Sequence, residues 1–261
     1  MKSLKLKIGL LISFIIIGVI LFINFYKPFD KEKELYKVLN GKHFTYYSYT
    51  KDNIKEIKSL NNYINSIYDD FENNLGVNIE KKIDIMIYKE ANDLTSAIDF
   101  GTPENGVPLG GANGIGIYLV ENQNAYDIKE IFRHELIHKL TLARNVSMSN
   151  PAYEWLGEGI AYYYTYIDNN KNYRANNALR VAALTNNIPD LNTILKNSSS
   201  VTDEFGYDAY RAIVDFIISE YGNNKLLEII DNAGVKNVNE VLNITEEKFI
   251  KEWKNFMIEN Y

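Results

Sequence analysis

The sequence contains no cysteine, and this absence removes several kinds of chemistry at once. A chain without thiols has no disulfide framework, no cysteine nucleophile, no thiolate zinc site and no lipidated cysteine anchor. Histidine is also scarce, because the 261 residues include only His43, His134 and His138. Any metal bound by this protein therefore has to be held by histidine, aspartate or glutamate side chains.

The charge balance of the chain argues against nucleic-acid binding. The formal net charge is −6 at pH 7. Residues 1–27 contribute four lysines and no acid, so the rest of the chain holds 24 basic against 34 acidic residues, a net charge of −10. Contact with a phosphate backbone requires a basic face. We therefore expect no nucleic-acid partner.

The remaining composition is that of a folded chain. Apolar residues make up 46% and charged residues 24%, which is close to average globular usage and excludes disordered, collagenous and coiled-coil chains. A chain of 261 residues can bury a sizeable core, and it has room for one enzyme-sized domain with an appendage.

A single long hydrophobic run lies near the N-terminus. Residues 8–25 carry no charge over 18 positions, which is near the lower limit for a membrane-spanning helix. Lys2, Lys5 and Lys7 precede the run, so the positive-inside rule places the N-terminus in the cytoplasm. A cleaved signal peptide is the alternative, but the run ends in bulky residues rather than in the small residues that cleavage requires.

These features predict three segments. Residues 1–27 form a cytoplasmic tip and a transmembrane anchor, residues 28–40 form a short charged stalk, and residues 41–261 form the folded domain. We expect a single-pass protein of the cell membrane with this domain on the extracytoplasmic side.

The folded domain has strands first and helices second. Residues 43–50, 83–88 and 114–120 have the composition or alternation of strands, and residues 52–75 have the period of a long amphipathic helix. Beyond residue 125 the chain is helical by period, with short breaks. We predict an α+β fold with a small N-terminal mixed sheet and a mostly helical C-terminal half.

The strongest chemical signal is His134-Glu-Leu-Ile-His138, inside a helical stretch. Side chains four residues apart project from one helix face, so both imidazoles can reach one zinc ion while Glu135 stands beside it. Composition alone predicts roughly 0.003 chance matches to such a motif in this chain. The alternative is that these are surface or core histidines that bind no metal, but this interpretation does not explain why they have the spacing of metal ligands.

A hydrolytic zinc site needs a third protein ligand and an open position for water. A histidine six residues after His138 would indicate one class of zinc enzyme, but that position holds Arg144, and no further histidine follows. The third ligand must therefore be a carboxylate. Glu158 lies twenty residues after His138 on a second helix, and Glu154, one turn earlier, is its rival.

The two motifs together resemble a known group of enzymes. HExxH followed at this distance by Trp155-Leu-Gly-Glu-Gly-Ile-Ala161 is similar to the gluzincins, the thermolysin-like and aminopeptidase-like zinc peptidases of the peptidase MA-like superfamily. The resemblance covers roughly residues 80–230, and it implies that Glu158 is the third zinc ligand. It also implies that the sheet packs on the HExxH helix.

A later helix extends the resemblance. Residues 206–222 are similar to an aromatic-led apolar helix of these families, and the leading tyrosine aligns with Tyr207. The resemblance implies that Tyr207 donates a hydrogen bond to the oxyanion of the transition state, a role that suits a phenol. Packing alone is the alternative for one of 20 tyrosines.

One segment departs from the family pattern. Aminopeptidases of this group hold the free amine of the substrate with an acidic residue on an edge strand, whereas Gly110-Gly-Ala-Asn-Gly114 has no acid. The strand that follows can still bind an extended peptide through its main chain, so Gly114, Ile115 and Gly116 are the expected substrate-binding residues. We therefore favour an endopeptidase over an aminopeptidase.

The sequence thus predicts a membrane-anchored zinc peptidase that acts on peptides or proteins, with Glu135 as the general base. The alternative from another class is an inactive membrane-tethered zinc-binding or adhesion module. Such a module has no need of a general base, so the presence of Glu135 favours the enzyme.

Overall fold

The computed structural model describes residues 35–90, 93–94, 110–112, 116–121, 127–144, 151–166, 173–188 and 207–261. The expected transmembrane segment, residues 8–25, lies outside these ranges. Within them, none of the helices combines the length and apolarity that a membrane crossing requires.

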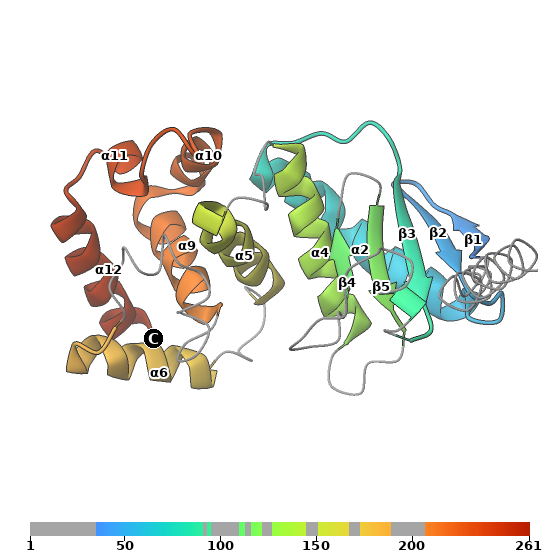
Figure 1. Cartoon of the computed structure of the whole chain (residues 1–261), viewed down its shortest axis with the longest axis horizontal. Helices are drawn as coiled ribbons and strands as arrows, with labels where there is room; N and C mark the ends of the chain where they lie inside the picture. Colours follow the sequence, from blue (N-terminus) through green and yellow to red (C-terminus); the bar gives the residue numbers. More distant parts are fainter. Residues whose placement is uncertain are drawn as a thin grey trace, which may run out of the picture.

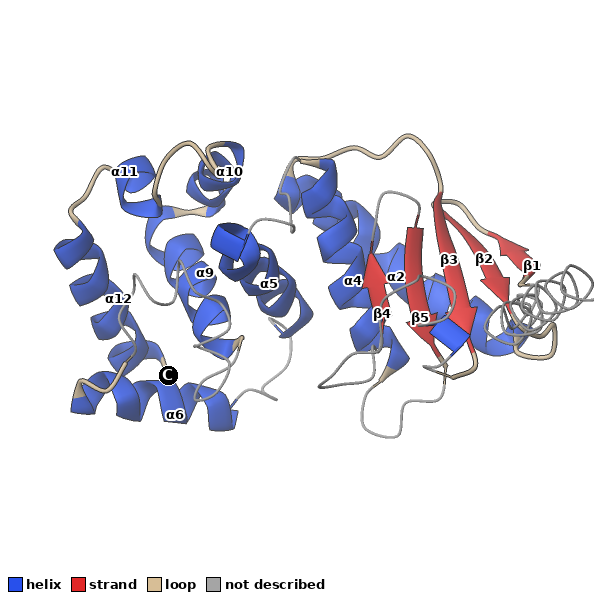
Figure 2. Cartoon of the chain, in the orientation of Figure 1, coloured by secondary structure: helices blue, strands red, loops and turns tan. Residues whose placement is uncertain are grey.

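A five-stranded mixed sheet forms the N-terminal half (Figure 1, Figure 2). The strand order is β1-β2-β3-β5-β4, with β2, β3 and β5 parallel and the outer strands β1 and β4 antiparallel to their neighbours. The strands are β1 (Tyr36–Asn40), β2 (Phe44–Ser48), β3 (Ile83–Tyr88), β4 (Gly110–Ala112) and β5 (Gly116–Val120).

The central strand, β3, has the alternating pattern of buried and partly exposed residues that is typical of a strand with one face in the core. Ile83, Ile85 and Ile87 of β3 are buried, while the residues between them are partly exposed. Helix α2 (Ile54–Leu75) buries a stripe of apolar residues in the same core, and α4 (Ile128–Ala143) packs against α2, β4 and β5. The predicted α+β class, with a small mixed sheet packed on the HExxH helix, is therefore confirmed.

The expected stalk over residues 28–40 is wrong at its C-terminal end. Residues 36–40 form β1, an edge strand that pairs with β2 and is only partly covered, with Tyr36 45% exposed. A strand without buried alternating positions carries little hydrophobic signal, which is why the sequence pattern missed it.

The C-terminal half is helical (Figure 2). Its longest helices form one core, in which α5 packs along α9 and α12 closes over α6 and α9. The helices are α5 (Pro151–Tyr166), α6 (Tyr173–Thr185), α9 (Asp208–Tyr221), α10 (Asn223–Asp231), α11 (Val238–Leu242) and α12 (Glu246–Asn260).

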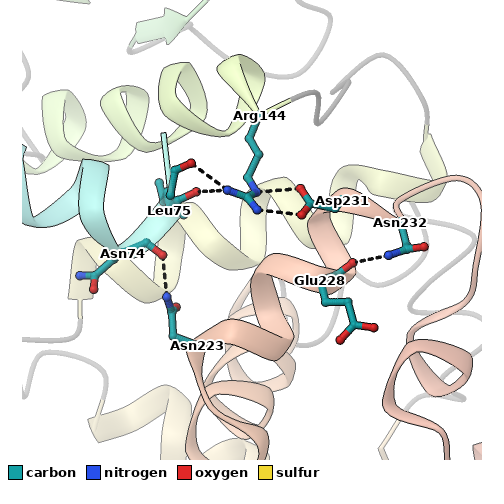
Figure 3. Close-up of polar contacts among 8 residues, drawn as sticks. Asn74, Leu75, Arg144, Asn223, Glu228, Asp231 and Asn232 are labelled. Carbon is teal, nitrogen blue, oxygen red and sulfur yellow. Dashed lines mark hydrogen bonds and ion pairs between the residues drawn. The ribbon is translucent and has the colours of Figure 1, made fainter. Parts of the chain in front are cut away.

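Arg144 joins the two halves at the C-terminal end of α4 (Figure 3). Its Nη1 atom donates to the backbone oxygens of Leu75 (3.0 Å) and Gly76 (2.8 Å) at the end of α2. Its Nε and Nη2 atoms form a bidentate pair with Asp231 at the end of α10, with both distances 2.8 Å. Beside it, Nδ2 of Asn223 donates to the backbone oxygen of Asn74 at 2.6 Å (Figure 3).

Candidate metal centre

Helix α4 is held firmly on the sheet. It begins after Asp127, whose side chain accepts a hydrogen bond from the backbone nitrogen of Lys129 at 2.9 Å. Phe132 packs edge-on against Phe44 of β2, and the centroids of the two rings lie 5.5 Å apart. This packing fixes the rotation of the helix and turns its His134 and His138 face toward α5.

Helix α5 approaches α9 very closely at Gly159, the residue next to Glu158. A Cβ atom added to Gly159 would lie 2.7 Å from the backbone oxygen of Tyr210 in α9. Only glycine allows this approach, because any side chain at that position would push the helices apart. Glu158 is therefore carried by a helix whose position is set by tight packing.

The two helices bring three potential ligands together. Nε2 of His134 lies 3.4 Å from Oε2 of Glu158, and Nε2 of His138 lies 3.5 Å from Oε1. The two Nε2 atoms are 2.9 Å apart, and ligand atoms of all three residues lie within 4.8 Å of one another. Glu154, the rival carboxylate, is not part of this group among the described residues.

This donor set fits a catalytic zinc ion. Two imidazole nitrogens and one carboxylate oxygen are the protein ligands of several hydrolytic zinc sites, which keep a fourth position for water. Burial by itself raises the pKa of Glu158, but hydrogen bonds and favourable charge interactions with His134 and His138 outweigh it and lower that pKa to about 2. Glu158 is thus an ionised carboxylate at neutral pH, as a metal ligand must be.

Glu135 sits next to this group with different electrostatics. Burial raises the pKa of Glu135 to about 7, with His134 acting against the shift and the carboxylate of Glu158 adding to it. A group with a pKa near the working pH can both accept and release a proton. Their surroundings therefore suit the two glutamates to different roles. Glu158 is held in its ionised form, and Glu135 can exchange a proton near neutral pH.

A row of tyrosines leads from the histidines to the start of α9. The ring centroid of Tyr162 lies 5.2 Å from that of His134, and Tyr207 lies 5.2 Å from Tyr162. Tyr207 is half-buried, and burial together with the charge of Glu158 raises its pKa to about 12, so its phenol stays a hydrogen-bond donor. Tyr210, one turn further along, is fully buried.

The expected substrate-binding strand needs a correction. Gly114 and Ile115 lie outside the described residues, and Gly116 begins β5, which pairs with β3 on one side and β4 on the other. A Cβ atom at Gly116 would lie 2.2 Å from the backbone oxygen of Asp84, so this glycine serves close strand packing. Among the described strands, β4 lies at the edge on this side of the sheet, next to α4 (Figure 1).

Sequence reasoning missed one residue that touches the ligands. Tyr162 lies four residues after Glu158, and this spacing places both side chains on one face of α5. The spacing was therefore a usable signal, but the contact itself depends on how α5 crosses α4.

Comparison with known proteins gives one match. A family model described as the peptidase MA superfamily matches residues 68–258, which is more than half of the chain and includes His134, Glu135, His138 and Glu158. No curated protein and no solved structure matches the chain.

Proposed function

Because this chain belongs to the peptidase MA superfamily, we propose that it is a zinc-dependent peptidase that hydrolyses bonds within peptides or proteins. The observation that carries the proposal is the group of His134, His138 and Glu158 with the poised carboxyl of Glu135 beside it. A binding module would need the three ligands but not the fourth group.

His134, His138 and Glu158 would hold the zinc ion. Bound there, zinc supplies Lewis acidity to water and to the scissile carbonyl. Glu135 accepts a proton from the attacking water on its carboxylate and passes it to the nitrogen of the leaving amine. The phenol of Tyr207 donates a hydrogen bond to the oxyanion that forms on the carbonyl oxygen.

The edge strand β4 is the proposed substrate platform. In the sheet that the described residues form, β4 is the last strand, and the main-chain groups on its outer side can add an extended peptide to the sheet alongside α4. Its three residues, Gly110–Ala112, carry no acidic side chain that could hold a free amine. This composition supports an endopeptidase over an aminopeptidase.

The direct test is hydrolysis of a diverse peptide library. The full-length chain, purified in mild detergent and loaded with zinc, should cut peptides at internal bonds that mass spectrometry identifies. The same protein treated with a chelator should leave the library intact, and added zinc should restore cleavage. A zinc-loaded protein that cuts no peptide would contradict the proposed activity.

We also propose that residues 8–25 anchor the chain in the cell membrane with the catalytic domain outside. The support is the uncharged run behind Lys2, Lys5 and Lys7. Protease added to intact cells should then digest the domain, while a cytoplasmic marker protein survives. Protection of the domain, or a mature chain that starts after Phe25, would refute this topology.

A further inference from the structure

The ring of His134 is the more exposed of the two imidazoles. The His134 side chain is 20% exposed, against 7% for His138. What sets the ring plane of His134 therefore bears directly on how the site binds a metal.

Metal-binding histidines are usually oriented by a hydrogen bond from the second ring nitrogen to a carboxylate or carbonyl. Within the described part of the chain, Nδ1 of His138 is buried without such a partner. Among the described residues, the contacts of His134 are with the other two ligands and with two rings, those of His138 and Tyr162. Ring contacts are thus a large part of what surrounds His134 among the described residues.

The contact with Tyr162 has the geometry of a specific aromatic pair. The ring centroids of His134 and Tyr162 lie 5.2 Å apart, and the ring planes are inclined at 88°. Edge-to-face packing at this separation is a favoured arrangement of aromatic rings. The ring of His138 meets His134 in the same manner, at 4.5 Å and 86°.

Tyr162 is itself held by other rings. Its ring centroid lies 5.2 Å from that of Tyr207 at the start of α9 and 5.7 Å from that of Tyr166, one turn further along α5. Because Glu158 and Tyr162 share one helix face, α5 supplies both a ligand and the ring that faces a ligand of α4. The crossing of α4 and α5 thus sets both contacts together.

We propose that Tyr162 is a positioning residue of the metal centre, whose ring fixes the plane of His134 so that Nε2 points toward Glu158 and His138. The inference rests on the proposed zinc site. The contact is one between the two rings, so the aromatic ring is required and the hydroxyl group is not.

The test compares variants of the full-length chain by two readouts. Zinc affinity is measured by competition with a chromophoric chelator, and the geometry of the site is read from the visible absorption bands of the cobalt-substituted protein. Tyr162→Leu should weaken zinc binding by about 10-fold or more, as the loss of an orienting partner does. It should also shift the cobalt bands. Tyr162→Phe should keep both wild-type values.

Tyr163→Leu is the matched control, because it removes a half-buried tyrosine from the same helix whose ring packs against Tyr164, with centroids 5.1 Å apart, and it should leave both readouts unchanged. Circular dichroism of the metal-free proteins checks folding, and Tyr162→Met is the second variant if Tyr162→Leu does not fold. Wild-type affinity and spectrum in a folded Tyr162→Leu or Tyr162→Met protein would overturn the inference. Equal losses in Tyr162→Phe or in Tyr163→Leu would also overturn it. Failure of the wild-type protein to bind zinc would instead overturn the proposed function.

Discussion

Replacing Glu135 with glutamine is expected to lower kcat for peptide hydrolysis by about 10² to 10⁴ while leaving zinc content unchanged. Glutamine keeps the size of the side chain but cannot accept a proton from water. Glu135 lies beside the ligand group and is not one of its three members, so the metal should stay bound. Steady-state kinetics on a cleaved peptide, together with metal analysis of the same sample, measures both quantities.

Two tyrosine variants, measured in the same assay, test which residue donates a hydrogen bond to the oxyanion. Tyr207→Phe should lower kcat by about 10² to 10³ without loss of zinc, as expected when one oxyanion donor is removed. Tyr210→Phe is the comparison and should keep its turnover, because the proposed mechanism gives Tyr210 no role and phenylalanine keeps the buried ring. Wild-type turnover by Glu135→Gln would remove the general base from the mechanism. A crippled Tyr210→Phe beside an active Tyr207→Phe would assign the oxyanion donor to the other tyrosine.

Replacing His138 with alanine is expected to abolish stoichiometric zinc binding and, with it, activity. The change removes one of three ligands from a buried position, and the remaining two cannot close a catalytic site. Zinc at 100 times its Kd should stabilise the folded wild-type protein by about 2.7 kcal/mol, and this stabilisation should vanish in the variant. Metal analysis after dialysis and thermal unfolding with and without zinc are the measurements.

His43 provides the control for this variant. It is the one histidine of the sequence outside the HExxH motif, and its ring packs against that of Tyr68 in α2, with centroids 4.2 Å apart. His43→Ala removes the same side chain from a place outside the ligand group, so zinc binding and its stabilising effect should persist. Tight zinc binding by a protein that lacks both His134 and His138 would rule out the site.

The ligand residues were predictable because their signal is local. His134 and His138 lie one turn apart on one helix, so spacing alone places both on the same face. The choice of Glu158 over Glu154 needed the resemblance to a family, and the structure brings Glu158 to the histidines. The α+β class followed in the same way from strand and helix periods along the chain.

What sequence reasoning got wrong depends on contacts between distant segments. Gly114, Ile115 and Gly116 were expected to bind an extended peptide through the main chain, yet Gly116 begins β5, which lies inside the sheet because β4 pairs antiparallel with it and takes the edge. Strand order is decided by the packing of whole elements, and no pattern within one strand reports it. The contact of Tyr162 with His134 was invisible for the same reason.

Arg144 shows how this ligand set constrains the ways in which the chain can evolve. It occupies the position, six residues after His138, where a third histidine would mark another class of zinc enzyme. Here its guanidinium group holds the ends of α2 and α10 together, so a change to histidine would leave the carbonyl oxygens of Leu75 and Gly76 and the carboxylate of Asp231 without it. A histidine at this position would therefore come at the loss of a structural joint between α2, α4 and α10.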